Sequence, residues 1–189
     1  METYTRIIEP ATEPITTAEA KDHMRITHTD EDTYIAGLIA VARMYIEDIS
    51  YRALVTQTWQ YSIPCFPAIK EIELPVPPLQ SITLIEYLDE VGVSTTFNAS
   101  NYIVDTAGLR GRVVLADSAN WPSPSSLYPV NPVRITFVAG YTAIQDIDKQ
   151  LMYFLVAHWY ENREPTISGT FARSVPTTLE QLISMRLIY

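Results

Sequence analysis

Histidine and glutamate side chains come closest in this sequence to the spacing of a metal or catalytic site. His158 and Glu161 lie three residues apart in an expected helix, where they could share a metal ion. The chain has 3 histidines, and the other two, His23 and His28, are far from this pair in sequence. We therefore interpret His158 as a packed or interface residue. His23 and His28 flank an expected turn between helices, which favours surface or capping roles.

The motifs of common enzyme classes are missing from the sequence. There is no Gly-x-Ser-x-Gly elbow, no phosphate-binding glycine loop and no His-Glu-x-x-His pair. The single cysteine, Cys65, excludes an internal disulfide framework and a cysteine-rich zinc site. It lies between Pro64 and Phe66 without a neighbouring base, so we expect a buried, unreactive thiol. The sequence thus predicts no catalytic residue, no metal site and no cofactor.

Three consecutive acids, Asp30, Glu31 and Asp32, form the densest charge cluster. Their spacing does not match a calcium-binding loop, and acids in the first turn of a helix complement its dipole. We also consider a functional role, in which this acidic surface avoids nucleic acid or meets a basic partner. The chain carries 13 Lys+Arg against 22 Asp+Glu, a net charge of −9. This balance argues against a protein that grips phosphates, since such affinity comes from clustered cations.

Aromatic residues are abundant, with 12 tyrosines and 3 tryptophans in 189 residues. Tyrosine and tryptophan are enriched in interface anchors. In the run from His158 to Arg163, large side chains surround one helix end, and we expect Tyr160 and Arg163 to lie at an interface with another protein chain. Beyond Pro165 and an expected hinge at residues 168–170, an apolar arm is a second candidate for the same contact. Its interface residues are Leu179, Leu182, Ile183, Leu187, Ile188 and Tyr189. Docking of this arm on its own helical bundle is the alternative.

Helical periodicity appears at both ends of the chain. Thr16 and Glu19 predict a capping box for a helix that ends near Arg25. Apolar residues at three- and four-residue spacing then predict an amphipathic helix of about five turns, beginning at residues 29–32 and reaching Ile49. Gly37, inside this helix, suggests close helix packing. Asp146 is expected to cap a third helix that runs to about Asn162, and a short fourth helix is expected over residues 178–186.

Residues 55–139 show a different residue pattern, in which short β-type runs are separated by prolines and glycines. The runs predict six or seven short, mostly antiparallel strands. Trp59 should pack in the β core, and Trp159 should pack on the helix stripe that contains Leu38, Ile39 and Ala42. The N-terminal sequence is polar and acidic, unlike a signal peptide, and no apolar run approaches the roughly 18 residues of a membrane span.

The expected fold class is therefore α+β, a helical bundle formed from N- and C-terminal helices with an inserted antiparallel β-rich domain. The expected parts are an N-terminal helical part (residues 1–54), the inserted domain (55–140), and C-terminal helices that complete the bundle and carry the arm (141–189).

Several sequence blocks resemble one protein family. They run in order over about residues 15–165: Ile15-Thr16-Thr17-Ala18-Glu19-Ala20-Lys21, His23-Met24-Arg25-Ile26, Asp30-Glu31-Asp32 with Tyr34-Ile35, Arg52-Ala53-Leu54-Val55-Thr56-Gln57-Thr58-Trp59, Leu74-Pro75-Val76-Pro77-Pro78-Leu79-Gln80-Ser81-Ile82, Phe137-Val138-Ala139-Gly140-Tyr141 and the segment from Val156 to Glu164. Together they resemble the head-tail connector proteins of tailed phages, also called head-completion adaptors, which occur in gene transfer agents as well.

The resemblance implies a structural virion protein without enzymatic activity. Such adaptors form a closed ring, usually twelve-fold, beneath the portal protein. They join the capsid to the stopper or tail-terminator protein and leave an axial channel through which DNA passes without sequence-specific binding. With this resemblance, Asp30, Glu31 and Asp32 are expected to face the channel or a neighbouring subunit. Tyr160, Arg163 and the apolar arm are expected to contact the portal protein or another subunit. The expected location is the head-tail interface of the virion, with assembly in the host cytoplasm, and no membrane partner is implied. Smaller relatives are mainly helical, so residues 55–139 would be an added β domain, placed at the ring periphery.

Two other functions compete with this interpretation. The aromatic β region could be a carbohydrate- or host-binding module of a virion that stacks exposed rings on its ligand. An enzyme with an unrecognised site is the third hypothesis. An acidic chain suits a DNA conduit, and an excess of apolar and aromatic residues suits a subunit buried against two neighbours in a closed ring.

Overall fold

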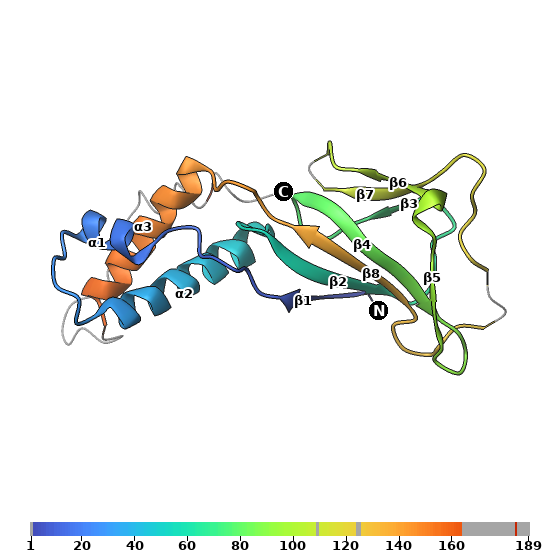
Figure 1. Cartoon of the computed structure of the whole chain (residues 1–189), viewed down its shortest axis with the longest axis horizontal. Coiled ribbons are helices and arrows are strands. Elements are labelled where there is room, and N and C mark those ends of the chain that lie inside the picture. Colours follow the sequence, from blue (N-terminus) through green and yellow to red (C-terminus); the bar gives the residue numbers. More distant parts are fainter. Residues whose placement is uncertain (1, 109, 124–125, 164–183, 185–189) are drawn as a thin grey trace. The chain divides into compact units, whose positions relative to one another are not determined.

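The computed structural model describes residues 2–108, 110–123, 126–163 and 184 (Figure 1). The chain divides into two compact units. A β unit comprises Met1–Ala11 and Thr56–Tyr141, and a helical unit comprises Thr12–Val55 and Thr142–Tyr189. The α+β class is confirmed, because helices from both ends of the chain pack together while an antiparallel β region is inserted between them. No described helix is long and apolar enough to cross a membrane.

The helical unit begins with α1 (Thr17–Met24), whose start confirms the expected capping box. The Thr16 hydroxyl accepts the backbone N–H of Glu19 at 3.1 Å, and the Glu19 carboxylate accepts the backbone N–H of Thr16 at 2.7 Å. These reciprocal bonds satisfy amide groups that the first turn leaves open. The helix stops at Arg25, whose left-handed backbone (φ 59°) turns the chain toward the next element.

The long helix α2 (Asp32–Ser50) and α3 (Asp146–Glu161) form the core of this unit. Their buried apolar side chains recur at the three- and four-residue spacing of one helix face, as the sequence predicts. The expected cap of α3 is shifted by one residue, because Gln145 occupies the N-cap and Asp146 is already helical. The core consists of Ile15, Ala20, Ile35, Ile39, Ala42, Ile46, Leu54, Leu151, Met152, Leu155 and Val156.

The tryptophan of α3 lies at the edge of this core. Trp159 is partly buried and packs against the cluster that includes Ile39 and Ala42, and Leu38 flanks the same cluster. Its ring also meets Tyr45 of α2 edge-on, with 5.9 Å between ring centroids. Packing of Trp159 on the helical core is therefore confirmed, while its burial is only partial.

The β unit contains two antiparallel sheets, and Figure 1 shows their strands. The first has the order β1-β2-β8-β4-β5, and the second has the order β3-β7-β6. The bounds are β1 Thr3–Ile8, β2 Gln57–Ile63, β3 Glu71–Glu73, β4 Leu79–Leu88, β5 Ser94–Thr96, β6 Tyr102–Asp105, β7 Arg112–Leu115 and β8 Val133–Ala139. Seven of these strands match the runs that the sequence predicts within residues 55–139.

The alternation of buried and partly exposed residues along β8 shows which of its faces belongs to the core. Along β8, every second residue is buried, from Val133 through Ile135 and Phe137 to Ala139. Its neighbours on either side are β2 and β4, and Phe137 is paired with Trp59 on one side and with Ile82 on the other. A period of two places one set of side chains on one face, which specifies the register.

The strand that sequence analysis did not predict is β1. Thr3–Ile8 pairs antiparallel with β2, from Thr3 opposite Ser62 to Ile8 opposite Thr58. Residues 1–11 therefore belong to the β unit and not to the N-terminal helical part expected over residues 1–54. The physical reason is that a neighbouring strand satisfies one row of the backbone groups of Thr3–Ile8, a pairing that joins residues 50 to 59 positions apart.

Candidate interaction surfaces

The acid cluster at the start of α2 divides into differently placed side chains. Asp30 is exposed. The Glu31 carboxylate accepts a hydrogen bond from the Tyr160 hydroxyl. It also forms an ion pair with Arg163, with 2.6 Å between Arg163 Nη2 and Glu31 Oε1. The Asp32 carboxylate accepts a hydrogen bond from Lys21, with 2.7 Å between Lys21 Nζ and Asp32 Oδ1. Two of the three predicted site acids are thus engaged by cations of the same chain, and Asp30 presents its carboxylate at the surface.

Glu31, Tyr34, Tyr160 and Arg163 form a cluster that we call the helix-end latch. The guanidinium of Arg163 lies over both rings, 4.7 Å from the centroid of Tyr34 and 4.8 Å from that of Tyr160. The hydrogen bond from Tyr160 and then that from Arg163 hold the pKa of Glu31 below its ordinary value. The bond to Glu31 raises the pKa of Tyr160. The latch joins the start of α2 to the end of α3, and it brings three of the predicted site residues together.

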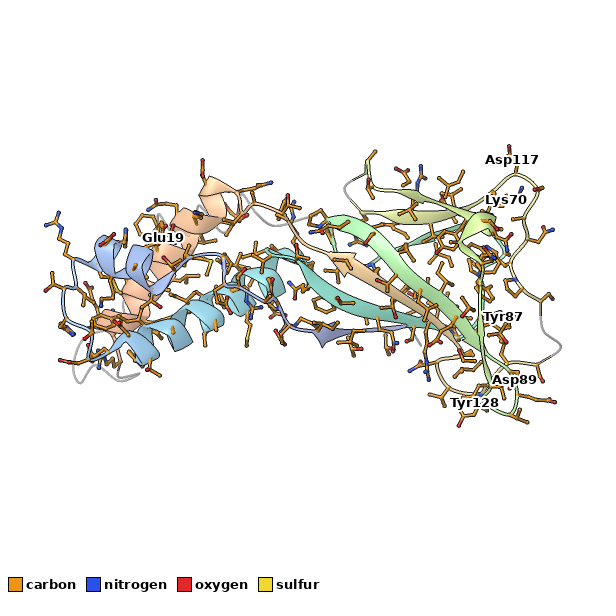
Figure 2. All side chains as sticks on the ribbon, in the orientation of Figure 1. Glu19, Lys70, Tyr87, Asp89, Asp117 and Tyr128 are labelled. Carbon is orange, nitrogen blue, oxygen red and sulfur yellow. The ribbon has the colours of Figure 1, made fainter. Side chains whose placement is uncertain are left out.

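Other salt bridges tie α1 to the rest of the helical unit. Lys21 on α1 pairs with Asp32 on α2, and Glu19 on α1 lies 3.4 Å from Lys149 on α3. Hydrogen bonds with the backbone and hydroxyl of Thr16 lower the pKa of Glu19, whose position on α1 is labelled in Figure 2. The charged groups at the helix ends therefore act within the unit, where they fix α1, α2 and α3 against one another.

A buried charge network supports the far end of α2. The Arg43 side chain is 4% exposed, and it lies 2.8 Å from Glu13 and 2.9 Å from Glu47. Burial alone would lower the pKa of Arg43, but the hydrogen bonds and charges of the two glutamates raise it above its ordinary value. The second oxygen of Glu47 accepts the backbone N–H of Leu54 at 3.0 Å. The network thus stabilises the chain where it leaves α2.

The aromatic residues of the β unit stack on one another. Phe66 and Trp121 are stacked with 5.4 Å between ring centroids, and Phe97 and Tyr102 are stacked at 6.0 Å. Phe97 is buried, the other three rings are half-buried, and Trp121 Nε1 donates to the backbone oxygen of Ile69. Rings that cover one another in this way form a core, and they do not offer the open faces on which a sugar would stack. These four rings therefore do not support the carbohydrate-binding hypothesis, whereas Tyr4 and Tyr128 of the β unit are exposed.

An apolar tip lies at the end of β4. Val91, Val93, Tyr128 and Val130 are exposed there by 75%, 58%, 40% and 62%. The Asp89 carboxylate accepts the backbone N–H groups of Val91 and Val93, and a β-bridge joins Asp89 to Leu127. Figure 2 shows Asp89 and Tyr128 at the same end of the β unit. The tip is therefore a braced pair of loops that presents apolar side chains.

The histidines and the cysteine that the sequence analysis considered for catalysis or metal binding are not grouped into a site in the described part of the chain. His23 stacks on Tyr153 with 5.3 Å between centroids, and His158 is half-buried on α3. Within the described part of the chain, no group of three His, Cys, Asp or Glu side chains could hold a metal ion. The expectation of a buried Cys65 is wrong: the thiol is exposed, because it follows the last residues of β2 in a short bend.

Trp59 differs from its expected place in the β core. Its side chain is half-buried, with the Tyr4 ring at 6.0 Å and the Arg6 guanidinium 5.6 Å from its centroid. Both neighbours come from β1, the strand that the sequence analysis missed. The expected arm residues Leu179, Leu182, Ile183, Leu187, Ile188 and Tyr189 lie outside the described residues.

Comparison with known proteins identifies the relationship. Residues 14–87 match a family described as "Phage gp6-like head-tail connector protein". The resemblance to head-tail connectors is confirmed. The matched stretch contains α1, α2 and the latch residue Glu31. The family name denotes a structural component and no enzymatic activity. No curated protein matches the chain in sequence.

Solved structures of gene transfer agents share the fold over nearly the whole chain. A chain of "Virion of native gene transfer agent (GTA) particle" aligns with a TM-score of 0.79 and 21% identity, covering 99% of this chain and 96% of that one. A chain of "Neck of empty GTA particle computed with C6 symmetry" gives 0.76 and 20%, with 99% and 96% covered. A third, from "Neck of native GTA particle computed with C12 symmetry", gives 0.69 and 20%, with 97% and 96% covered. The β unit is therefore part of the shared fold.

Proposed function

We propose that this chain is a head-tail connector in the neck of a phage or phage-like particle. Its copies form a closed ring beneath the portal protein, join the capsid to a stopper or tail-terminator protein, and leave an axial channel for DNA. One observation carries the proposal: a connector family matches residues 14–87, and neck structures match the fold over at least 97% of the chain. The C12 symmetry of one such neck supports a twelve-fold ring.

The interactions within the helical unit suit a ring subunit. Charges at the helix ends are paired within the chain, so the three helices can act as one rigid block. The latch residues Tyr160 and Arg163, half-buried and exposed respectively, are proposed to lie at the subunit or portal contact. Rigid subunits with one repeated contact close into a ring when the rotation between neighbours divides a full turn.

The proposed ring predicts binding to portal-bearing capsids. Purified chain should bind capsids that contain the portal protein of the same particle and should not bind capsids that lack it. Quantitative mass spectrometry should give about twelve copies of the chain for each portal ring, in line with the C12 neck. Absence of portal-dependent binding would overturn the proposal, and another copy number would overturn the twelve-fold ring.

The DNA channel is proposed to be lined by acids, and Asp30 is the candidate that the latch and Lys21 leave exposed. An acidic wall offers no counterion-release gain to a passing phosphate backbone. Asp30→Lys should therefore slow DNA ejection. Asp117→Lys is the matched control, because Asp117 is also exposed and gives the same change in net charge from the β unit. Equal ejection rates in both variants would refute a channel position for Asp30.

A further inference from the structure

The helical unit has one apolar surface that its own core does not use. All five exposed large hydrophobic side chains of its described residues lie on α2 or directly after it: Tyr34, Val41, Met44, Tyr45 and Tyr51. Four of them, together with Gly37, recur at three-, four- and seven-residue spacing along one side of the helix. We call Tyr34, Gly37, Val41, Met44 and Tyr45 the α2 stripe. At its border Tyr34 contacts Arg163 and Tyr45 contacts Trp159. Exposed apolar side chains gathered on one helix face in this way indicate an interaction site.

The stripe is distinct from the face of α2 that builds the core. Ile35, Ile39, Ala42 and Ile46 are buried and point to α3, whereas the stripe residues are exposed by 39–48% where the side chain is large. Among described residues, no atom lies within 4 Å of the position that a Cβ on Gly37 would take. The close packing expected at Gly37 is therefore absent within the described chain, and a helix from elsewhere could approach α2 there.

The chain leaves α3 at the beginning of this stripe. Arg163 comes two residues after α3, and its guanidinium lies 4.7 Å from the ring centroid of Tyr34, the first stripe residue. The ion pair to Glu31 fixes Arg163 at this place. Residues 164–189 follow Arg163 in the sequence.

The sequence of that segment complements the stripe. Leu179, Leu182, Ile183 and Leu187 recur at three- and four-residue spacing, which is typical of a helix with one apolar face. Such a short helix needs a partner surface to be stable. Among the described residues of the helical unit, the stripe is the surface that could bury it.

We propose that the α2 stripe is a docking site for residues 178–189 of a second copy of this chain. The length of the connection favours the second copy over the same copy. Residues 164–177 can span roughly 46 Å when extended, which is enough to reach past the 19 residues of α2, about 28 Å long, to a neighbouring copy. Connections between helices packed in one bundle usually take two to eight residues. The proposal rests on the proposed ring, in which it assigns the contact between neighbours.

Photo-crosslinking from the stripe tests this proposal with the full chain. The photoreactive amino acid p-benzoylphenylalanine replaces Tyr45, and the matched control carries it in place of Tyr128, which is equally exposed in the β unit. Both proteins are irradiated free in solution and bound to portal-bearing capsids, then separated on denaturing gels. Expected is a covalent dimer from the Tyr45 protein whose cross-linked peptide lies within residues 178–189. Adding Leu182→Asp and Ile183→Asp should reduce this dimer at least tenfold without changing helical circular dichroism.

The other outcomes overturn the proposal in distinguishable ways. A monomer in which residue 45 is linked to residues 178–189 places the segment on its own chain. A link to the portal protein, or to any other segment, assigns the stripe to a different occupant. Capsid-bound rings that assemble without the dimer refute this docking but leave the proposed function intact. If the chain fails to bind portal-bearing capsids, the proposed function fails, and the absence of dimer in free protein then refutes the docking as well.

Discussion

The buried network around Arg43 gives the sharpest stability prediction. Arg43 is 4% exposed and Glu47 is 8% exposed, so both charges have been removed from water. Arg43→Met would keep much of the side-chain volume but would deprive the buried Glu47 carboxylate of its guanidinium. Removing one partner of a buried ion pair costs about 3–5 kcal/mol, because the remaining charge loses its compensation. For a chain of this size, such a loss lowers the melting temperature by roughly 6–20 °C.

The assay is thermal and urea unfolding followed by circular dichroism at the helical minimum. Lys149→Met serves as the matched control, because Lys149 lies 3.4 Å from Glu19 and both side chains are about one-third exposed or more. An exposed pair contributes about 0–1 kcal/mol. The double variant Arg43→Met, Glu47→Gln should recover part of the loss, since it removes both buried charges and keeps a side-chain oxygen for the Leu54 N–H. A loss below about 1 kcal/mol for Arg43→Met, or no recovery in the double variant, would refute the reasoning.

Three further predictions address other parts of the chain. Glu31→Gln should weaken the latch: because the pKa of Glu31 is lowered on folding, its contribution is present above the ordinary value of 4.5 and fades as the pH falls through the lowered value. Denaturant unfolding at several pH values should therefore separate wild type from Glu31→Gln at pH 7, and the difference should shrink as the pH falls below 4.5; a difference that does not change with pH would contradict this contribution. Phe97→Ala removes a buried ring and should destabilise the β unit by about 3–5 kcal/mol, measured by urea unfolding of tryptophan fluorescence; a loss under 1 kcal/mol would place that ring outside the core. Cys65 is exposed, so native protein should react with Ellman's reagent as fast as urea-unfolded protein, and a rate at least a hundredfold slower would indicate a buried thiol.

Local patterns made most of the fold predictable. The Thr16–Glu19 capping box depends on residues three positions apart, and both of its hydrogen bonds form as expected. The alternation of Val133–Ala139 likewise specifies its own buried face. The missed strand β1 has β-branched residues, but its partner Gln57–Ile63 is about 50 residues away and only the pairing makes it a strand. Exposure of Cys65 depends on how the chain bends after β2, which neighbouring residue types do not reveal.

The sequence allowed single residues of the candidate site to be selected, but not the contacts that these residues make with one another. Sequence analysis selected Glu31, Tyr160 and Arg163 separately, the first for a channel or subunit contact and the others for a portal or subunit contact. In the structure they contact one another, across 129 and 132 residues of sequence. That contact follows from the packing of α2 on α3, where the helix ends meet. Single-sequence periodicity predicts each helix and its apolar face, but it does not show which helix ends lie together.

The two faces of α2 have different roles, and the exposed face is the one that its own helical unit does not explain. One face is buried against α3, and its ends are held by charges, with Glu31 paired to Arg163 at one end and Arg43 bound between two glutamates toward the other. Nothing in the described helical unit requires Val41 or Met44 to be apolar, because both lie outside the core. Polar side chains would serve a solvent-facing position better, and Gly37 weakens the helix without a described neighbour that needs the space. The proposed partner would explain these residues by covering them, which makes the occupant of α2 the most direct test of how copies of this chain assemble.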